Sequence, residues 1–217
     1  MGAIVAAVAL SLLWVETGRG NVDPTFAALV SYLLFWIPLL SAVLVVRVRR
    51  WGGSHPIAWR VSLLDVLLGL GMGFLLRTLA ALIEFAIRGT IVAPSFIAPT
   101  GASVAIVVSW VVIAVIAPLL IAPIVEELFF RGTLLMALKR PGKGTEASVA
   151  AVFLAALMFA LPHAIGVNNV RDGLVAFTSA TVLGLGAGGL ALATGRIGAP
   201  IIAHVTFNAG LLLLLVV

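Results

Sequence analysis

The chain has 217 residues, of which 63% are hydrophobic and only 10% are charged, and its mean hydropathy is +1.27. A soluble domain of this length carries about a quarter charged residues, so the composition excludes a water-soluble globular protein. The net charge of +5 comes from arginines and lysines beside apolar segments, which is typical of membrane topology rather than of a nucleic-acid surface. The chain has no cysteine, which excludes disulfides and thiolate ligands or nucleophiles. We therefore expect an integral membrane protein that binds no nucleic acid.

Apolar segments follow one another along the chain and predict an all-α, polytopic bundle of transmembrane helices. They cover residues 2–15, 25–46, 61–87, 102–138, 147–161, 174–194 and 197–217. This pattern predicts about seven membrane segments, or eight if the fourth splits, in a single integral-membrane domain of residues 1–217. The first segment is short, but no basic residues precede it and no small-residue cleavage site follows it. We interpret it as an uncleaved helix rather than a signal peptide.

Basic residues in two connectors predict the orientation of the bundle. Residues 47–60 contain four arginines, and residues 139–143 contain two lysines and one arginine. Positively charged loops stay in the cytoplasm, so we expect both connectors on that side, with the N-terminus inside and the C-terminus outside. A chain rich in Ala, Val, Leu, Gly and Arg, with few lysines, points to a prokaryotic plasma membrane.

The fourth segment is too long for a simple crossing. Its length of about 37 residues corresponds to on the order of 55 Å of helix, against a hydrocarbon core of about 30 Å. The segment must therefore tilt, kink or split. Pro118 and Pro123 are the predicted break points, because proline lacks a backbone N–H and clashes with the preceding turn.

Glycines spaced four apart predict close helix packing. Gly69 and Gly73 form one such pair, and Gly184 and Gly188 form another. The second pair lies in a glycine-rich run that superficially resembles a dinucleotide-binding loop. No strand precedes this run and the segment is apolar throughout, so we expect small-residue helix faces instead.

Ionisable residues within apolar membrane segments are costly and therefore indicate function. Glu126, Glu127 and Arg131 lie together in the fourth segment. Residues four apart share a helical face, so Glu127 can pair with Arg131 while Glu126 points about 100° away. Without a partner in its own turn, Glu126 is suited to proton transfer.

The four-residue spacing recurs at Phe159/His163 and at His204/Asn208. His204 and Asn208 are expected to project together into the bundle, where both can donate hydrogen bonds to an oxygen that gains negative charge. His163 can orient or deprotonate a water held by Glu126.

The depth of these polar residues sets a further expectation. At 1.5 Å per residue from the helix ends, Glu126 and His204 lie on the cytoplasmic side or near the midplane, whereas His163 lies deeper. Tilt, or a helix broken near Pro162, is needed to bring His163 level with the others.

Three motifs in this order resemble those of the type II CAAX prenyl endopeptidase family, the CPBP or Abi group of intramembrane proteases. They are Glu-Glu-Leu-Phe-Phe-Arg at 126–131, Phe-x-x-x-His at 159–163 and His-x-x-x-Asn at 204–208, and the similar region runs from about residue 102 to the C-terminus. The resemblance implies an endopeptidase that cuts a peptide or lipidated protein, of the prenylated CAAX type, at the membrane.

The resemblance also implies a role for each motif residue. Glu126 and His163 would activate the attacking water, and His204 and Asn208 would stabilise the tetrahedral oxyanion. Glu127 and Arg131 would hold the site in shape. This chemistry needs no cofactor and no metal.

Other functions remain open at the level of the sequence. Glu126, His163 and His204 would suffice for a zinc site, although the His-Glu-x-x-His helix typical of zinc proteases is missing. A non-catalytic membrane protein that binds a peptide, such as a bacteriocin self-immunity factor, would keep its function after Glu126→Gln. A proton-coupled transporter would also use buried glutamates and histidines, but the chain has no repeated half with paired broken helices.

Each polar residue also has a purely structural interpretation. The pair of Glu127 with Arg131 can be a plain intramembrane salt bridge, and His204 with Asn208 can hydrogen-bond between helices. In the third segment, Arg77 and Glu84 lie two turns apart on one face and either pair with neighbours or line a water-filled opening. The sequence assigns no role to Asp65.

Overall fold

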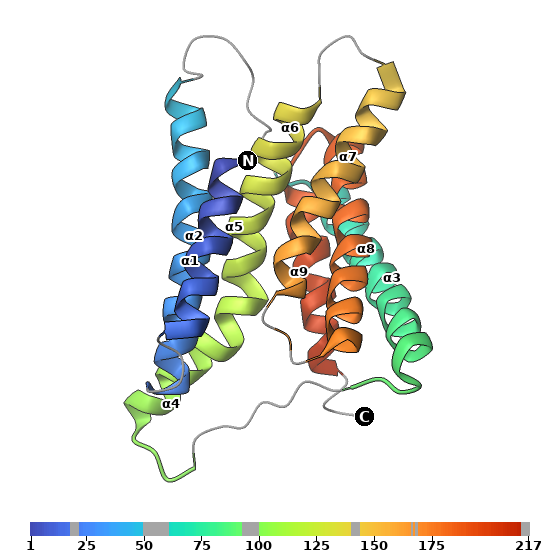
Figure 1. Cartoon of the computed structure of the whole chain (residues 1–217). Coiled ribbons are helices and arrows are strands. Elements are labelled where there is room, and N and C mark those ends of the chain that lie inside the picture. Colours follow the sequence, from blue (N-terminus) through green and yellow to red (C-terminus); the bar gives the residue numbers. More distant parts are fainter. Residues whose placement is uncertain are drawn as a thin grey trace.

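A computed structural model describes residues 1–17, 22–49, 61–92, 100–139, 144–165, 167 and 169–213 of the chain. Every regular element in these residues is a helix, which confirms the predicted all-α bundle (Figure 1). The helices are α1 (Gly2–Thr17), α2 (Pro24–Arg49), α3 (Leu63–Arg88), α4 (Val104–Trp110), η2 (Val111–Ile121), α5 (Ala122–Phe129), η3 (Phe130–Leu134), α6 (Leu135–Leu138), α7 (Gly144–Ala160), η4 (Leu161–Ala164), α8 (Val170–Thr194) and α9 (Gly198–Leu213).

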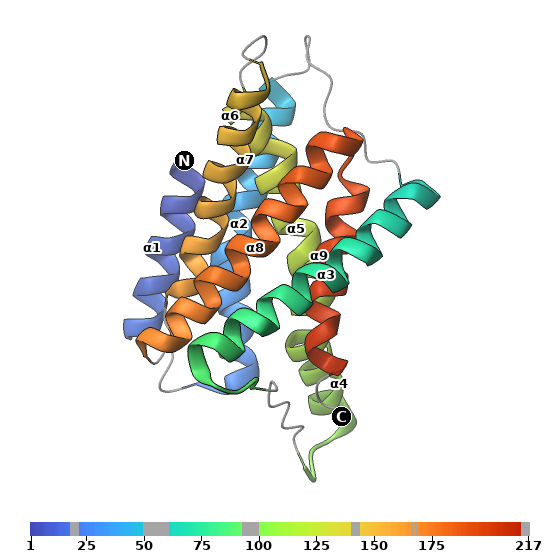
Figure 2. The same ribbon diagram turned by 90° about the vertical axis from the view of Figure 1, so that its right-hand side faces the viewer.

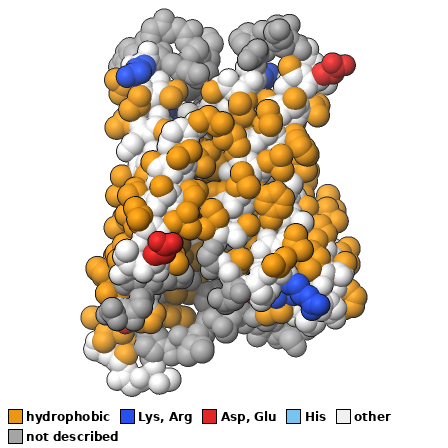
Figure 3. All heavy atoms as spheres, in the orientation of Figure 1, with side chains coloured by type: hydrophobic (Ala, Val, Ile, Leu, Met, Phe, Trp, Pro, Cys, Tyr) orange, Lys and Arg blue, Asp and Glu red, His pale blue; other side chains and the backbone are white. Residues whose placement is uncertain are grey.

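The hydropathy of these helices makes the protein an integral membrane protein. In the described residues, five helical runs are long and apolar enough to cross a bilayer: Pro24–Arg49, Leu63–Arg88, Val104–Leu138, Gly144–Ala164 and Val170–Thr194. The helix Gly2–Thr17 is apolar but shorter. Hydrophobic side chains cover the middle of the face shown in Figure 3, with charged side chains toward its two ends. The count of about seven crossings stays a prediction.

The helix ends are arranged as the charge pattern predicts. In Figure 1, α2 and α6 end at the same end of the bundle, where α7 begins and where α8 turns into α9. The basic residues Arg47, Arg49 and Lys139 therefore gather at this end, and the other basic residues of the two connectors lie outside the described part of the chain. Which end faces the cytoplasm stays a prediction.

The long fourth segment is one continuous helix of 35 residues, Val104–Leu138. It does not split at Pro118 or Pro123. It changes its winding instead, because η2 and η3 are π-helical stretches between the α-helical parts α4, α5 and α6. Pro118 lies inside η2, which is 11 residues long.

The glycine pairs pack helices together as predicted. A Cβ on Gly73 of α3 would lie 2.6 Å from the Ala203 carbonyl oxygen of α9, and a Cβ on Gly184 of α8 would lie 2.9 Å from the Cα of Ala156 in α7. Both distances are too short for any side chain, so glycine permits the close approach. Figure 2 shows α3 crossing α9.

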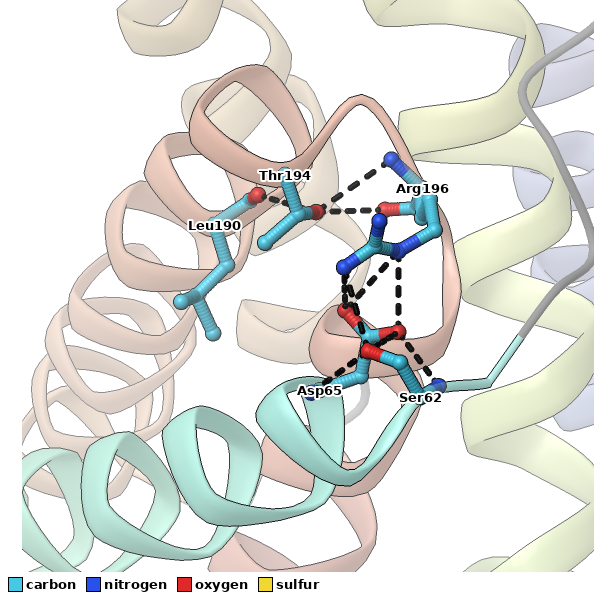
Figure 4. Close-up of polar contacts among 5 residues, drawn as sticks. All are labelled: Ser62, Asp65, Leu190, Thr194 and Arg196. Atoms are coloured by element: carbon cyan, nitrogen blue, oxygen red, sulfur yellow. Dashed lines mark hydrogen bonds and ion pairs between the residues drawn. The ribbon is translucent and has the colours of Figure 1, made fainter.

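Asp65, to which the sequence assigned no role, ties α3 to the turn between α8 and α9 (Figure 4). Its carboxylate is fully buried and accepts two hydrogen bonds from the Arg196 guanidinium, from Nε at 2.9 Å and from NH2 at 3.0 Å. It also accepts from the Ser62 backbone N–H at 2.8 Å and so completes a capping box at the start of α3. This bidentate pair fixes the beginning of α9 against α3.

Candidate active site

The predicted catalytic residues come from three separate parts of the chain and line one cavity of about 430 Å³. α5 supplies Glu126, η4 supplies His163, and α9 supplies His204 and Asn208. Further wall residues come from α2, α3, η2 and α8. The structure thus brings together all four residues that the motifs single out.

Glu127 lies behind this cavity, where it joins two motifs. Its side chain is fully buried, and its Oε1 accepts a hydrogen bond from Arg131 NH1 at 2.8 Å, so the predicted ion pair is present. The same Oε1 lies 2.9 Å from His204 Nδ1. Arg131 NH2 also donates to the Gly184 carbonyl oxygen at 3.2 Å. Glu127 is therefore more than the partner of Arg131, because it also orients His204.

The contact with Glu127 determines which nitrogen of the His204 ring carries a proton and which one faces Glu126. A carboxylate that already pairs with an arginine accepts hydrogen bonds only, so the Nδ1 of His204 carries a proton. The opposite nitrogen, Nε2, faces Glu126, with 3.8 Å between Nε2 and Oε2. This separation exceeds a hydrogen bond and leaves the Glu126 carboxylate able to bind a water molecule.

His163 is oriented by the backbone of its own segment. Its Nδ1 lies 2.8 Å from the Phe159 carbonyl oxygen, which only accepts, so Nδ1 is the protonated nitrogen and Nε2 is free to accept. α7 ends at Ala160 and continues as the 3₁₀ turn η4, which contains Pro162. The predicted break near Pro162 is thus present, and His163 lines the same cavity as Glu126.

Asn208 is anchored by a carbonyl group that the long helix leaves free. Its Nδ2 donates to the Pro118 carbonyl oxygen at 2.9 Å. In an α-helical or π-helical turn this oxygen would accept from Ala122 or Pro123. The Ala122 N–H donates to the Ala117 oxygen instead, and Pro123 has no N–H. Because an amide nitrogen carries two hydrogens, the second one remains available to the cavity.

Phe159 packs against Arg131, His163 and His204. Its ring is fully buried and lies under the Arg131 guanidinium, with 4.6 Å between Cζ and the ring centroid. The rings of His163 and His204 lie 4.7 Å and 5.6 Å from it. Phe159 therefore holds the two imidazoles and the arginine at fixed positions around one apolar surface.

A second cavity of about 350 Å³ adjoins the first. Its walls come from α1, α2, α5 and the region of η4, and it shares Tyr32, Ala122, Glu126 and His163 with the larger cavity. Glu126 and His163 thus lie where the two cavities meet. Sequence reasoning did not single out Tyr32, because a lone tyrosine in an apolar helix carries no motif.

The zinc alternative requires a cluster of ligands. Within the described part of the chain, no group of three or more His, Asp or Glu side chains is placed to hold a metal ion. Glu126, His163 and His204 line one cavity without forming such a cluster.

Comparison with known families agrees with the motif resemblance. Residues 108–210 match a family model, Rce1-like, described as type II CAAX prenyl endopeptidase Rce1-like. The matched region runs from the end of α4 into α9 and contains every motif residue. Searches of curated proteins and of solved structures find no match.

Proposed function

Because residues 108–210 match the model of the type II CAAX prenyl endopeptidase Rce1-like family, we propose that this protein is an intramembrane endopeptidase that removes the C-terminal tail of a lipidated, CAAX-type substrate. The observation that carries the proposal is the placement of Glu126, His163, His204 and Asn208 around one cavity inside a membrane bundle. Ionisable groups that served only in packing would be expected to contact other helices rather than line a cavity.

In the proposed reaction, Glu126 and the Nε2 of His163 hold a water molecule between them. Glu126 takes a proton as the water oxygen attacks the scissile carbonyl carbon, which becomes tetrahedral and carries an oxyanion. Glu126 then gives this proton to the leaving amine nitrogen as the carbon–nitrogen bond breaks. General acid–base catalysis of this kind contributes about 10²- to 10⁴-fold to the rate.

The oxyanion would be stabilised by His204 and Asn208. Asn208 offers its second Nδ2 hydrogen, because Pro118 accepts the first. His204 would donate from Nε2 when its ring carries both protons, with its Nδ1 held 2.9 Å from Glu127. Donors fixed before the reaction cost no reorganisation when the negative charge develops.

The test is cleavage of a fluorogenic peptide that carries a prenylated cysteine followed by three residues, by detergent-purified protein. We expect Glu126→Gln to lower kcat by about 10²- to 10⁴-fold, because the proton acceptor is lost. The matched control is Glu146→Gln, a change of the same kind at an exposed position in the first turn of α7, which keeps wild-type activity. Full activity of Glu126→Gln would contradict the proposal and favour the peptide-binding alternative.

Treatment with a chelator tests whether the reaction depends on a metal ion. We propose that the reaction uses no metal, since a carboxylate and an imidazole already face the position of the water. Activity that survives exhaustive dialysis against a strong chelator supports this. Activity that is lost on chelation and restored by Zn²⁺ contradicts it.

A further inference from the structure

A cation lines the cavity that holds the catalytic groups. Arg77 projects from α3 between α9 side chains, with its Cζ 5.0 Å from the centre of the Phe207 ring. Its aliphatic stem packs where Gly210 leaves room, because a Cβ there would lie 2.6 Å from the Arg77 Cγ. The side chain is 11% exposed, and it is among the residues that line the larger cavity.

The guanidinium of Arg77 is poorly satisfied by the described protein. Its nearest carboxylate oxygen is Glu84 Oε2, at 3.9 Å from NH2, which exceeds hydrogen-bond distance. Its Nε is buried without a hydrogen-bond partner. The other oxygen of Glu84 faces Arg88 Nε at 3.4 Å and the Val92 N–H at 3.3 Å. A buried guanidinium with unused donors is costly unless an anion completes it.

Arg77 of α3 contacts α9 at a distance from His204 that a short peptide tail can span. The Arg77 stem packs against Gly210 and its guanidinium lies beside Phe207, positions about 9 Å and about 4.5 Å along the helix axis from His204. A CAAX-type substrate has three residues after its prenylated cysteine, and three extended residues span at most about 10–11 Å. A scissile carbonyl beside His204 and Asn208 therefore leaves the terminal carboxylate of the tail within reach of Arg77.

We propose that Arg77 binds the free C-terminal carboxylate of the substrate and so sets how far from its end the peptide is cut. The inference rests on the proposed endopeptidase function and adds a specificity-determining residue to it. The planar guanidinium suits a carboxylate, because its N–H groups can donate two parallel hydrogen bonds. Peptides that continue beyond this point would have no carboxylate there and would leave the donors unpaired.

The residues that line the second cavity indicate which way the substrate peptide is oriented. Among the residues that the structure describes, its lining includes aromatic side chains such as Phe35 and Trp36 but no lysine or arginine. The tail with its carboxylate thus belongs in the larger cavity, which Arg77 lines, and the lipidated side of the peptide belongs in the smaller one. Glu126 and His163, which line both, lie at the bond to be cut.

The experiment compares two fluorescent peptides that carry a farnesylated cysteine and three further residues, one ending in a carboxylate and one in an amide. Binding is measured to Glu126→Gln protein in nanodiscs, which should hold peptide without cutting it. We expect the acid to bind about 10- to 100-fold more tightly than the amide, as hydrogen bonds to a charged group contribute. Arg77→Met in the same background should abolish this difference, and Arg77→Lys should keep part of it.

The matched control is Arg88→Met, which removes the other arginine beside Glu84 and should leave the preference for the acid intact. Equal binding of acid and amide by the parent protein, or a preference that survives Arg77→Met, overturns the inference. The outcome does not depend on catalysis: acid-selective binding that requires Arg77, in a wild-type protein that cuts neither peptide, refutes the proposed hydrolysis while the carboxylate site stands.

Discussion

At the scale of single residues, Glu126 and Glu127 have different surroundings, so we expect their substitutions to affect activity and stability differently. Glu126 faces the cavity, and its Oε2 lies 3.8 Å from His204 Nε2. Glu127 is fully buried and meets both Arg131 and His204. On the proposed function, Glu126 would act in the reaction, whereas Glu127 contacts Arg131 and His204 and would hold them in position.

We expect Glu127→Gln to destabilise the protein by about 3–5 kcal/mol, because it leaves the buried Arg131 guanidinium without its counter-charge. Glu126→Gln should change stability by less than about 1 kcal/mol. Thermal unfolding in detergent, followed by helical circular dichroism, measures both. If the two variants melt together, the distinction between the two roles is wrong.

The anchoring of Asn208 leads to a second prediction. Pro123→Ala restores a backbone N–H that can donate to the Pro118 oxygen and so competes with Asn208 for it. We expect a loss of about 10-fold in kcat for Pro123→Ala and of about 10²- to 10³-fold for Asn208→Ala.

A double-mutant cycle tests whether the two changes act through the same contact. When Asn208 is already alanine, Pro123→Ala should have no further effect on kcat. Losses that simply multiply would show that Pro123 acts on the reaction by another route.

At the scale of elements, the position of α9 depends on its contact with α3. Gly73→Ala would place a Cβ 2.6 Å from the Ala203 oxygen, next to His204. We expect a loss of about 1–3 kcal/mol of stability from overpacking, together with a fall in cleavage as α9 shifts.

Gly71→Ala is the matched control for this change. It lies on the same helix, and a Cβ there meets nothing within 4 Å. Melting temperature and cleavage rate of the two variants separate a packing effect from a helix-propensity effect, which both substitutions share. Equal behaviour of the two would mean that the α3–α9 contact does not position the site.

The elements themselves were largely predictable, because a helix in a membrane must present a long apolar run. The segment predicted at 61–87 corresponds to α3, and the pair Glu127/Arg131 follows from helical spacing within one element. The π-helical winding of η2 was not predictable. It depends on where each N–H finds a carbonyl, and a proline shows only that one donor is missing.

At the scale of the whole molecule, the charge pattern makes a prediction about topology that the missing cysteines make easy to test. Since the chain has no cysteine, a single substituted cysteine gives labelling without background. Glu146→Cys, at the start of α7, and Thr90→Cys, just after α3, lie at opposite ends of the bundle (Figure 1).

We expect a membrane-impermeant maleimide to label Thr90→Cys in intact cells and Glu146→Cys only after the membrane is opened. Labelling in the reverse order would invert the predicted topology. The control is the cysteine-free parent, which should take up no label.

The contacts that the sequence could not supply are those between distant segments. Asp65 and Arg196 are 131 positions apart, and Glu127 and His204 are 77 apart. One sequence lists such residues but does not say which helices are neighbours or how they are rotated. The motif order could still assemble the site, since the resemblance grouped Glu126, His163, His204 and Asn208 without any knowledge of the packing. Arg77 belongs to no motif, so only the cavity shows its position.

The two cavities share Tyr32, Ala122, Glu126 and His163 but otherwise draw mostly on different helices. On the proposed function, this arrangement would separate the reaction from the choice of substrate. Much of the smaller cavity is walled by α1 and α2, which lie outside the family match at residues 108–210. Substitutions in these first two helices leave the motif residues themselves unchanged, although Tyr32 of α2 also lines the larger cavity. If residues 1–49 are exchanged between two such proteins, we expect the substrate preference to be transferred and the catalytic mechanism to stay the same. The N-terminal helices are therefore where new substrate specificities can evolve or be engineered.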